Sequence, residues 1–330
     1  MDTVLLLGTG PTALSALESL AARFRVAGLV RDARGSPGGK DEVVERARAL
    51  EVPVFSDLSI EGVEQAVIQG RPDCTVVSSY DRILPGRVLG RCRFVNVHYA
   101  PLPEYRGRAN VNWAIINGET KTAITIHVMA PGLDAGNILY QHPVPIGADD
   151  TVGDLYAKLN EVQREVLGKT VARYISGYEG EPQDEAAATY GCTRVPGDGE
   201  IKWASSTRQI YALVRALAPP YPGAHTYLEG RRITILRASP QANAPRYVGR
   251  VPGRVVGRSR QNGHVDVLTG DGVLRIHEVV AGDSVAGPAS AFIGSTRQTL
   301  GLGTADLLAR IELLESRLNL LDGKGHDSAS

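Results

Sequence analysis

Three side chains in the sequence could together move an acyl group between two nitrogens. Asn96 and His98 lie two residues apart in the apolar run 94–98, which predicts a short strand with both side chains on one side. Asp134 follows His98 by 36 residues, within a Pro-Gly-Leu-Asp-Ala-Gly segment. An amide can donate to an oxyanion, an imidazole can carry a proton, and a carboxylate can orient the imidazole. No serine or cysteine accompanies them, so the trio favours acyl transfer onto an amine without a covalent intermediate.

The elements around this trio predict an α/β domain with a mostly parallel sheet. Apolar runs of strand length alternate with segments of helical spacing, at residues 4–7, 13–23, 25–30, 41–50, 52–55, 60–69 and 74–78. Open α/β sheets bind ligands outside the carboxyl ends of their strands. The predicted strand 94–98 opens into a loop rich in Pro, Gly and Arg, so we expect the trio at this edge.

The rest of the chain predicts a second, different domain. A long amphipathic helix follows Thr151, and after a polar linker several short strands predict a small β-barrel. We expect a catalytic domain over 1–180, a linker over 181–192, the barrel over 193–290, and a C-terminal helix with a disordered tail over 291–330. Leucine and isoleucine recur at 3,4 spacing from Leu307 to Leu321, which indicates a helix packed on its own chain or a small dimer seam.

Composition excludes several classes of protein. The chain has 330 residues with 36 basic and 36 acidic side chains, so its net charge gives no bias towards nucleic acid or membrane. The three cysteines, Cys74, Cys92 and Cys192, are scattered and match neither a disulfide framework nor a zinc site. No apolar run approaches a membrane span. We expect a cytoplasmic protein without a metal.

Two other functions compete at this point. The turn Gly8-Thr9-Gly10 follows a strand and precedes a helix, as in dinucleotide-binding domains, although Pro11 removes one backbone donor. Residues 208–283 hold eleven Lys and Arg against five Asp and Glu, which could indicate a nucleic-acid-binding barrel beside an inactive catalytic domain. The first alternative predicts a bound NAD or NADP, and the second predicts salt-sensitive binding of tRNA.

Residues 96–108, Asn-Val-His-Tyr-Ala-Pro-Leu-Pro-Glu-Tyr-Arg-Gly-Arg, resemble the signature of the folate-dependent formyltransferases. The spacing from His98 to Asp134 fits the same family, and residues 79–85 resemble its loop for 10-formyltetrahydrofolate. The chain looks most like the sugar-nucleotide N-formyltransferases of the aminoarabinose type, which are related to methionyl-tRNA formyltransferase. The resemblance implies a Rossmann-like domain with a mostly parallel twisted sheet, followed by an OB-like β-barrel domain.

The resemblance also implies roles for individual residues. Asn96 would donate to the oxyanion, His98 would carry the proton, and Asp134 would orient His98. The co-substrate 10-formyltetrahydrofolate would contact Tyr80, Arg82, Ile83, Arg108, Ala130, Leu133 and Asp134. We expect the amine acceptor to contact Tyr99, Tyr105, Arg106 and Asn112.

The acceptor implied is the primary amine of a nucleotide-linked amino sugar. The tRNA enzymes usually carry a longer basic loop where this chain has residues 31–42, and they tend to show Arg-Gly-Ala-Ala-Pro where it has Arg-Gly-Arg-Ala-Asn. Methionyl-tRNA and an amino-acid-type amine of secondary metabolism remain alternatives. Tyr99 replaces a residue that is usually small in the family, and a homodimer is left open.

Overall fold

The computed structural model describes residues 1–32, 41–282 and 284–325. Residues 33–40 of the segment 31–42 and the end of the predicted disordered tail lie outside these ranges, whereas residues 323–325 are helical. The chain divides into two compact units. The first comprises Met1–Ala114 with Glu119–Arg194, and the second Ile115–Gly118 with Val195–Ser330.

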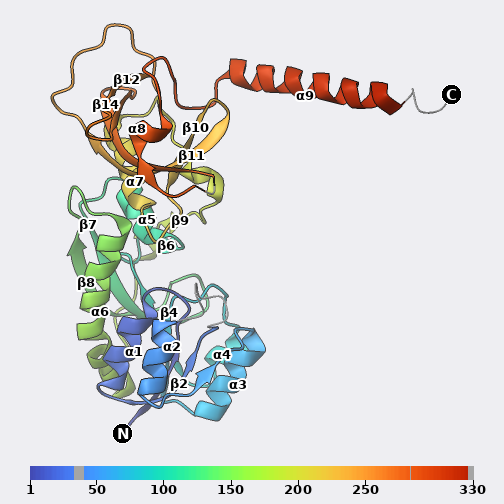
Figure 1. The fold of residues 1–330 in the computed structure, drawn as a ribbon. Coiled ribbons are helices and arrows are strands. Elements are labelled where there is room, and N and C mark those ends of the chain that lie inside the picture. The colour runs from blue at the N-terminus through green and yellow to red at the C-terminus, as the bar shows by residue number, and fades with distance from the viewer. Residues whose placement is uncertain (33–40, 283, 326–330) are drawn as a thin grey trace. The chain divides into compact units, whose positions relative to one another are not determined.

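The first unit is built on a seven-stranded, mostly parallel sheet of order β3-β2-β1-β4-β5-β7-β8 (Figure 1). Its strands are β1 (Thr3–Leu7), β2 (Arg25–Val30), β3 (Val54–Phe55), β4 (Cys74–Ser78), β5 (Arg93–His98), β7 (Lys121–Val128) and β8 (Ile138–Pro145). The strands from β3 to β5 in this order pair in parallel, and β5–β7 and β7–β8 pair antiparallel. The predicted α/β fold class is therefore confirmed.

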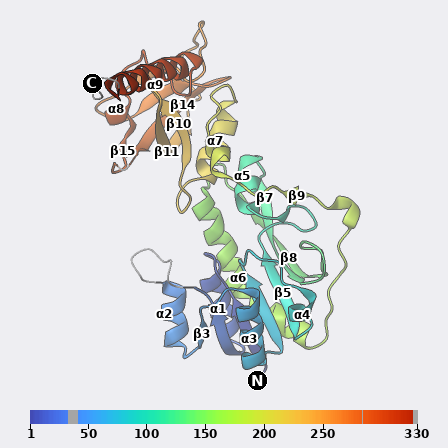
Figure 2. The same cartoon turned by 90° about the vertical axis from the view of Figure 1, so that its right-hand side faces the viewer.

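Helices cover this sheet on both faces. They are α1 (Ala13–Ala21), α2 (Glu42–Ala49), α3 (Ile60–Gly70), α4 (Gly86–Leu89), α5 (Asn110–Ile116) and α6 (Val152–Ile175). Helix α1 packs against α2 and α6, and α3 packs against α4 (Figure 2). Every residue of β1 and β4 is buried, as expected for strands between two helical layers. Asp41 caps α2, and Thr151 and Asp154 form a capping box on α6.

The second unit is an antiparallel β domain, as the sequence predicts. Its strands are β10 (Ala224–Leu228), β11 (Arg231–Pro240), β12 (Val255–Arg258), β13 (Val265–Leu268), β14 (Val273–Ala281) and β15 (Gly287–Pro288), ordered β10-β11-β14-β13-β12 with β15 on β14. Helix α7 (Thr207–Ala216) buries Ile210 and Val214 in the core of this unit. Helices α8 (Ala289–Phe292) and α9 (Thr304–Gly325) complete it.

Within the described ranges, no helix combines the length and the apolar character that crossing a membrane requires.

The loop after β5 is fixed to α6 through Tyr99. Its hydroxyl lies 2.8 Å from Oδ1 of Asn160 and 3.0 Å from Oε1 of Gln163, and the side chain is 7% exposed. Gln163 in turn donates to the carbonyl of Thr12 and to Ser15. Burial raises the pKa of Tyr99, so its hydroxyl stays a donor. Tyr99 therefore points into the scaffold, which differs from the predicted contact with the acceptor.

Replacing Tyr99 by Phe should lower the free energy of unfolding by about 1–3 kcal/mol, because buried acceptors on α6 lose their donor. Urea unfolding measures the change. Tyr140→Phe on β8, where the ring is half-exposed, is the matched control and should change stability much less. If Tyr99→Phe left stability unchanged and weakened binding of an acceptor, the result would favour the predicted contact between Tyr99 and the acceptor.

Candidate active site

The candidate site begins at the carboxyl end of β5. Asn96 and His98 are side by side on one face of this strand, which lies between parallel β4 and antiparallel β7. His98 is 6% exposed and Asn96 is partly exposed. The predicted strand therefore places an amide and a buried imidazole together at the sheet edge where ligands bind in this class of fold.

Asp134 reaches this edge from the loop between β7 and β8. Its Oδ1 lies 3.4 Å from Nδ2 of Asn96, and its Oδ2 lies 3.7 Å from Nδ1 of His98. The backbone N–H of Gly107 donates to Oδ2 at 2.9 Å. The loop needs Gly136, because a Cβ there would come within 1.9 Å of the carbonyl oxygen of Val128. The three residues of the predicted trio thus meet in one place.

The carboxyl group of Asp134 is ionised. Burial alone would raise its pKa, but the contacts with His127 and His98 and the hydrogen bond from Gly107 outweigh burial and hold the pKa well below its usual range. A fixed negative charge therefore faces the imidazole of His98.

His98 is held neutral. Burial lowers its pKa, and only part of this effect is offset by Asp134. Its Nε2 lies 2.9 Å from the carbonyl oxygen of Tyr105 and 3.0 Å from Nδ2 of Asn110, while Nδ1 faces Asp134. A neutral imidazole can accept or donate a proton near neutral pH, as a proton carrier must.

His127 is a fourth member that the sequence analysis missed. It lies on β7 directly opposite Asn96, with Nε2 3.1 Å from Nδ2 of Asn96 and 3.6 Å from Oδ1 of Asp134. Its Nδ1 lies 3.0 Å from the carbonyl oxygen of Val128, so Nδ1 carries the proton and Nε2 accepts from Asn96. His127 therefore fixes the orientation of the Asn96 amide. The antiparallel register of β5 and β7, which creates this pair, could not be read from the sequence.

Arg106 stabilises the loop that carries Asp134 through hydrogen bonds to residues of the segment after α6. Its guanidinium, 1% exposed, donates to Glu185 at 2.6 and 2.8 Å and to Gln183 at 2.8 Å. Gln183 donates to the carbonyl oxygens of Asp134 and Gly136, both at 2.7 Å. The structure thus differs from the predicted acceptor contact of Arg106, because its donors are used within the protein.

The two other residues predicted to contact the acceptor, Asn112 and Tyr105, differ in solvent exposure. Asn112 is 1% exposed, so its side chain is directed into the interior rather than to a ligand. Tyr105 is half-buried, and its hydroxyl donates to Glu119 at 2.7 Å. Of the residues predicted to contact the acceptor, Tyr105 alone is not buried.

The predicted folate residues come together on neighbouring loops. Arg108 donates to the carbonyl of Asp81, which ties the loop after β5 to the loop after β4. Leu133 lies next to Gly107 and is 50% exposed. The exposed members also include Arg82 and Ile83, and Ala130 is partly exposed. The Tyr80 ring packs in the core beside α3, and its hydroxyl donates to the carbonyl of Leu58.

Backbone strain concentrates around these loops. Four non-glycine residues there have positive φ: Ser79 at 64°, Tyr105 at 57°, Ala109 at 59° and Asp134 at 51°. Such conformations cost energy and persist only where the surroundings enforce them, which is typical of functional sites.

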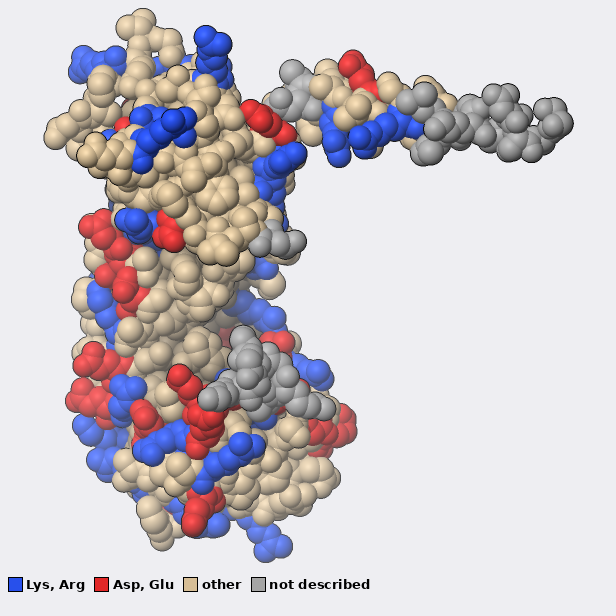
Figure 3. All heavy atoms as spheres, viewed as in Figure 1, with Lys and Arg blue, Asp and Glu red and all other residues tan. Residues whose placement is uncertain are grey.

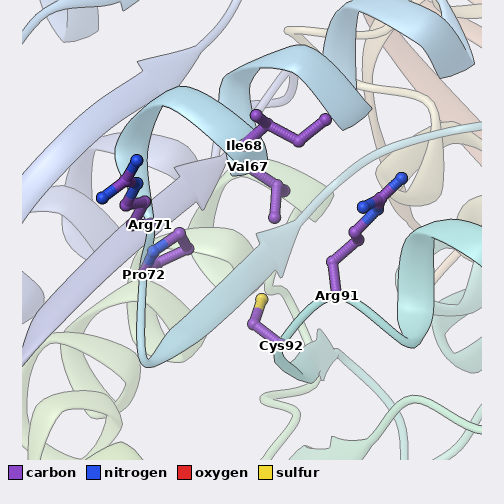
Figure 4. Close-up of a pocket in the computed structure, with 6 residues that line it drawn as sticks. All are labelled: Val67, Ile68, Arg71, Pro72, Arg91 and Cys92. Atoms are coloured by element: carbon purple, nitrogen blue, oxygen red, sulfur yellow. The ribbon is translucent and has the colours of Figure 1, made fainter.

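A surface cavity of about 300 Å³ is lined by Val67, Ile68, Arg71, Pro72, Arg91 and Cys92 (Figure 4). It contains none of the predicted site residues, so it is separate from the trio. Across the described residues, no group of three or more His, Cys, Asp and Glu could hold a metal ion.

Comparison with known proteins gives matches over most of the chain. The family described as formyl transferase matches residues 50–171, and the formyl transferase C-terminal domain matches residues 195–297. Similar solved structures include HypX from Aquifex aeolicus in complex with tetrahydrofolic acid, with a TM-score of 0.63 and 19% identity. That match covers 89% of this chain and 47% of HypX, so the chain spans about half the length of HypX.

Smaller solved proteins match over nearly their whole length. An N-formyltransferase from Helicobacter canadensis, in complex with folinic acid and dTDP-3-aminofucose, has a TM-score of 0.62 and 19% identity, covering 84% of this chain and 98% of that one. A 4-N formyltransferase from Francisella tularensis has a TM-score of 0.56 and 18% identity, covering 68% and 91%. At these identities the solved structures establish a shared fold.

The lowered pKa of His98 predicts a pH-dependent stability. In the unfolded chain a histidine takes up a proton below about pH 6.5, whereas buried His98 resists it, so stability falls as the pH drops below this value. The slope of unfolding free energy against pH between 7.5 and 5 should be smaller in His98→Gln. His225 and His277, whose pKa values burial also lowers, contribute to the slope that remains. An identical slope in the variant would show that His98 titrates equally in both states.

Proposed function

Because the chain belongs to the formyltransferase family, we propose that it transfers the formyl group of 10-formyltetrahydrofolate to the primary amine of a nucleotide-linked amino sugar. The observation that carries the proposal is the convergence of Asn96, His98 and an ionised Asp134 at the end of β5. These groups supply an oxyanion donor, a proton carrier and an orienting charge, and direct transfer between two nitrogens needs all three.

The reaction would proceed through one tetrahedral intermediate. The amine lone pair attacks the formyl carbon, and the carbonyl electrons move onto its oxygen. Asn96 exchanges its long contact with Asp134, at 3.4 Å, for this oxyanion, while His127 keeps the amide oriented. The C–N10 bond then breaks, and the proton lost by the attacking amine passes by way of His98 to N10 of the folate. Asp134 stabilises the imidazolium formed between these two proton transfers.

The exposed loops offer suitable chemistry for the folate. Ile83 and Leu133 present apolar surface of the kind that binds a flat heterocycle, at 85% and 50% exposure. Arg82 and Arg108 carry exposed positive charge, which suits the carboxylates of a folate tail. The folate ligands of the Aquifex aeolicus and Helicobacter canadensis structures support this assignment.

An amino sugar is favoured as the acceptor by the second of these structures, which contains dTDP-3-aminofucose and matches this chain over 98% of its own length. The chain also has equal numbers of basic and acidic residues. Binding a tRNA through its phosphates requires a concentrated positive surface, so the composition favours the smaller substrate.

Variants of the trio test the chemistry. His98→Ala should lower kcat about 10²–10⁴-fold, and Asn96→Ala about 10²–10³-fold, with binding of 5-formyltetrahydrofolate retained. His264→Ala in the antiparallel unit is the matched control and should keep the parent rate. The measurement is the formyl gain of the acceptor by mass spectrometry, with UDP-, dTDP- and GDP-linked amino sugars as acceptors.

The same screen contains the outcomes that would contradict the proposal. Formylation of methionyl-tRNA alone, or of a free amino-acid amine alone, would agree with the proposed catalytic roles of the trio but would contradict an amino sugar as the acceptor. A near-normal rate in His98→Ala would show that His98 does not carry the proton.

A further inference from the structure

Helix α9 carries an apolar stripe that the rest of the chain leaves exposed. Its side chains are described from Leu307 to Asn319, and the stripe consists of Leu307, Ile311, Leu314 and Leu318, at 48%, 50%, 45% and 59% exposure. Helix α7 of the same unit, by contrast, buries its apolar residues. A continuous apolar stripe on an exposed helix indicates a surface that another protein chain covers.

The spacing of the stripe is that of a coiled-coil seam. The steps between its members are four, three and four residues, which places Leu307 and Leu314 at d positions and Ile311 and Leu318 at a positions of a heptad. Ile311 is a β-branched residue at one of the two a positions, and leucine occupies both d positions, a combination that favours two parallel strands. The stripe therefore fits a second helix of the same kind.

The charges beside the seam identify that second helix. In this register Arg310 stands at a g position and Glu315 at the following e position. In a parallel pair of identical helices, g of one chain lies beside the next e of its partner, so Arg310 would meet Glu315 at both edges. In an antiparallel pair, g lies beside g and the two Arg310 side chains would meet. The charge pattern thus fits a second copy of this chain in parallel orientation.

We propose that α9 pairs with α9 of a second copy as a parallel two-stranded coiled coil, making the protein a homodimer. Figure 3 shows basic and acidic side chains among other residues on the visible face of α9. This inference does not depend on the proposed reaction.

Sedimentation equilibrium on the full chain should give a dimer that Ile311→Glu converts to a monomer. Arg310→Glu and Glu315→Arg should each weaken the dimer at least tenfold, and the double variant should regain most of the affinity, because the pair is restored with its signs exchanged. A monomeric parent protein, or a dimer that Ile311→Glu leaves intact, would overturn the proposal.

Cross-linking tests the orientation. In a Cys192→Ser background, Leu314→Cys lies in the seam and should form an intermolecular disulfide on mild oxidation. Ser316→Cys lies at the outward f position of the same turn and is the matched control. Equal cross-linking by both variants would contradict the parallel seam.

A second, independent observation concerns Nε2 of His98, the ring nitrogen opposite the one that faces Asp134. Its Nε2 lies 2.9 Å from an acceptor, the carbonyl oxygen of Tyr105, and 3.0 Å from a donor, Nδ2 of Asn110. One ring nitrogen can donate or accept, so only one of these bonds forms at a time. Nδ2 of Asn110 is also 3.1 Å from the carbonyl oxygen of Gly107, which keeps the amide nitrogen turned towards the ring.

Each of these two contacts stabilises a different neutral tautomer of the His98 imidazole. A proton on Nε2 satisfies Tyr105 and leaves Nδ1 as a base facing Asp134. A proton on Nδ1 lets Nε2 accept from Asn110 and presents a donor at the reacting side. Resting on the proposed function, we infer that Asn110 is a positioning residue that makes the second form of His98 available, so that one imidazole can act as base and then as acid.

Two substitutions of similar size separate this role from a packing role. Asn110→Leu removes the donor, and ¹⁵N NMR of the ring should show His98 protonated almost wholly at Nε2, with kcat reduced about tenfold. Asn110→Asp presents only acceptors, so the acid limb of kcat/KM should move up by about one pH unit. The other titratable groups facing His98, Asp134 and His127, are unchanged in both variants.

Asn262→Asp in the antiparallel unit is the control and should leave the His98 signal and the pH profile unchanged. An unaltered protonation pattern of His98 in Asn110→Leu would overturn the inference. The NMR measurement needs no acceptor, so failure of the proposed reaction would be recognised separately.

Discussion

The carboxylate of Asp134 is the constraint on which the site depends. Its side chain is 12% exposed and lies beside two histidines, and a carboxylate withdrawn from water to this degree stays ionised only if fixed donors surround it. The first donor, the N–H of Gly107, comes from the loop after β5, and the second, the amide of Asn96, comes from β5 itself. The loop after β5 and the loop before β8 must therefore meet for the charge to exist.

The segment after α6 holds these loops in place. Gln183 binds the carbonyl oxygens on both sides of Asp134, and Arg106 holds Gln183 and Glu185 through a buried guanidinium. The short parallel pair of β6 (Arg106–Gly107) and β9 (Tyr190–Gly191) adds backbone bonds at the same point. Residues more than forty positions apart thus position one carboxylate, so a substitution in this segment acts on the site without touching a ligand.

Sequence patterns predicted the parts of the structure that depend on local periodicity. Strands β2 and β4 begin and end where the pattern indicates, because apolar runs are local signals. Side-chain direction is set by long-range packing instead. Tyr99 is directed to α6, and Arg106 to the segment after it, for reasons located more than sixty residues away. His127 joins Asn96 only through a cross-strand register, which no periodicity reveals.

The glycine turn after β1 shows how a motif can have a packing role. A Cβ at Gly8 would come within 2.8 Å of Ala13, and one at Gly10 within 2.5 Å of Ser79, so both glycines are required by internal contacts. The N–H groups of Gly8 and Thr9 are bonded to the carbonyls of Val30 and Ser79, and Pro11 has none.

Arg31 completes this arrangement, because its guanidinium donates to the carbonyl oxygens of Gly8 and Gly10. Backbone donors of this turn that a dinucleotide phosphate could use are thus bonded within the protein at Gly8 and Thr9, and a side chain of the protein lies against the turn. We therefore expect the ligand-binding surface at the loops after β4 and β5, where exposed side chains and residues with positive φ are found together.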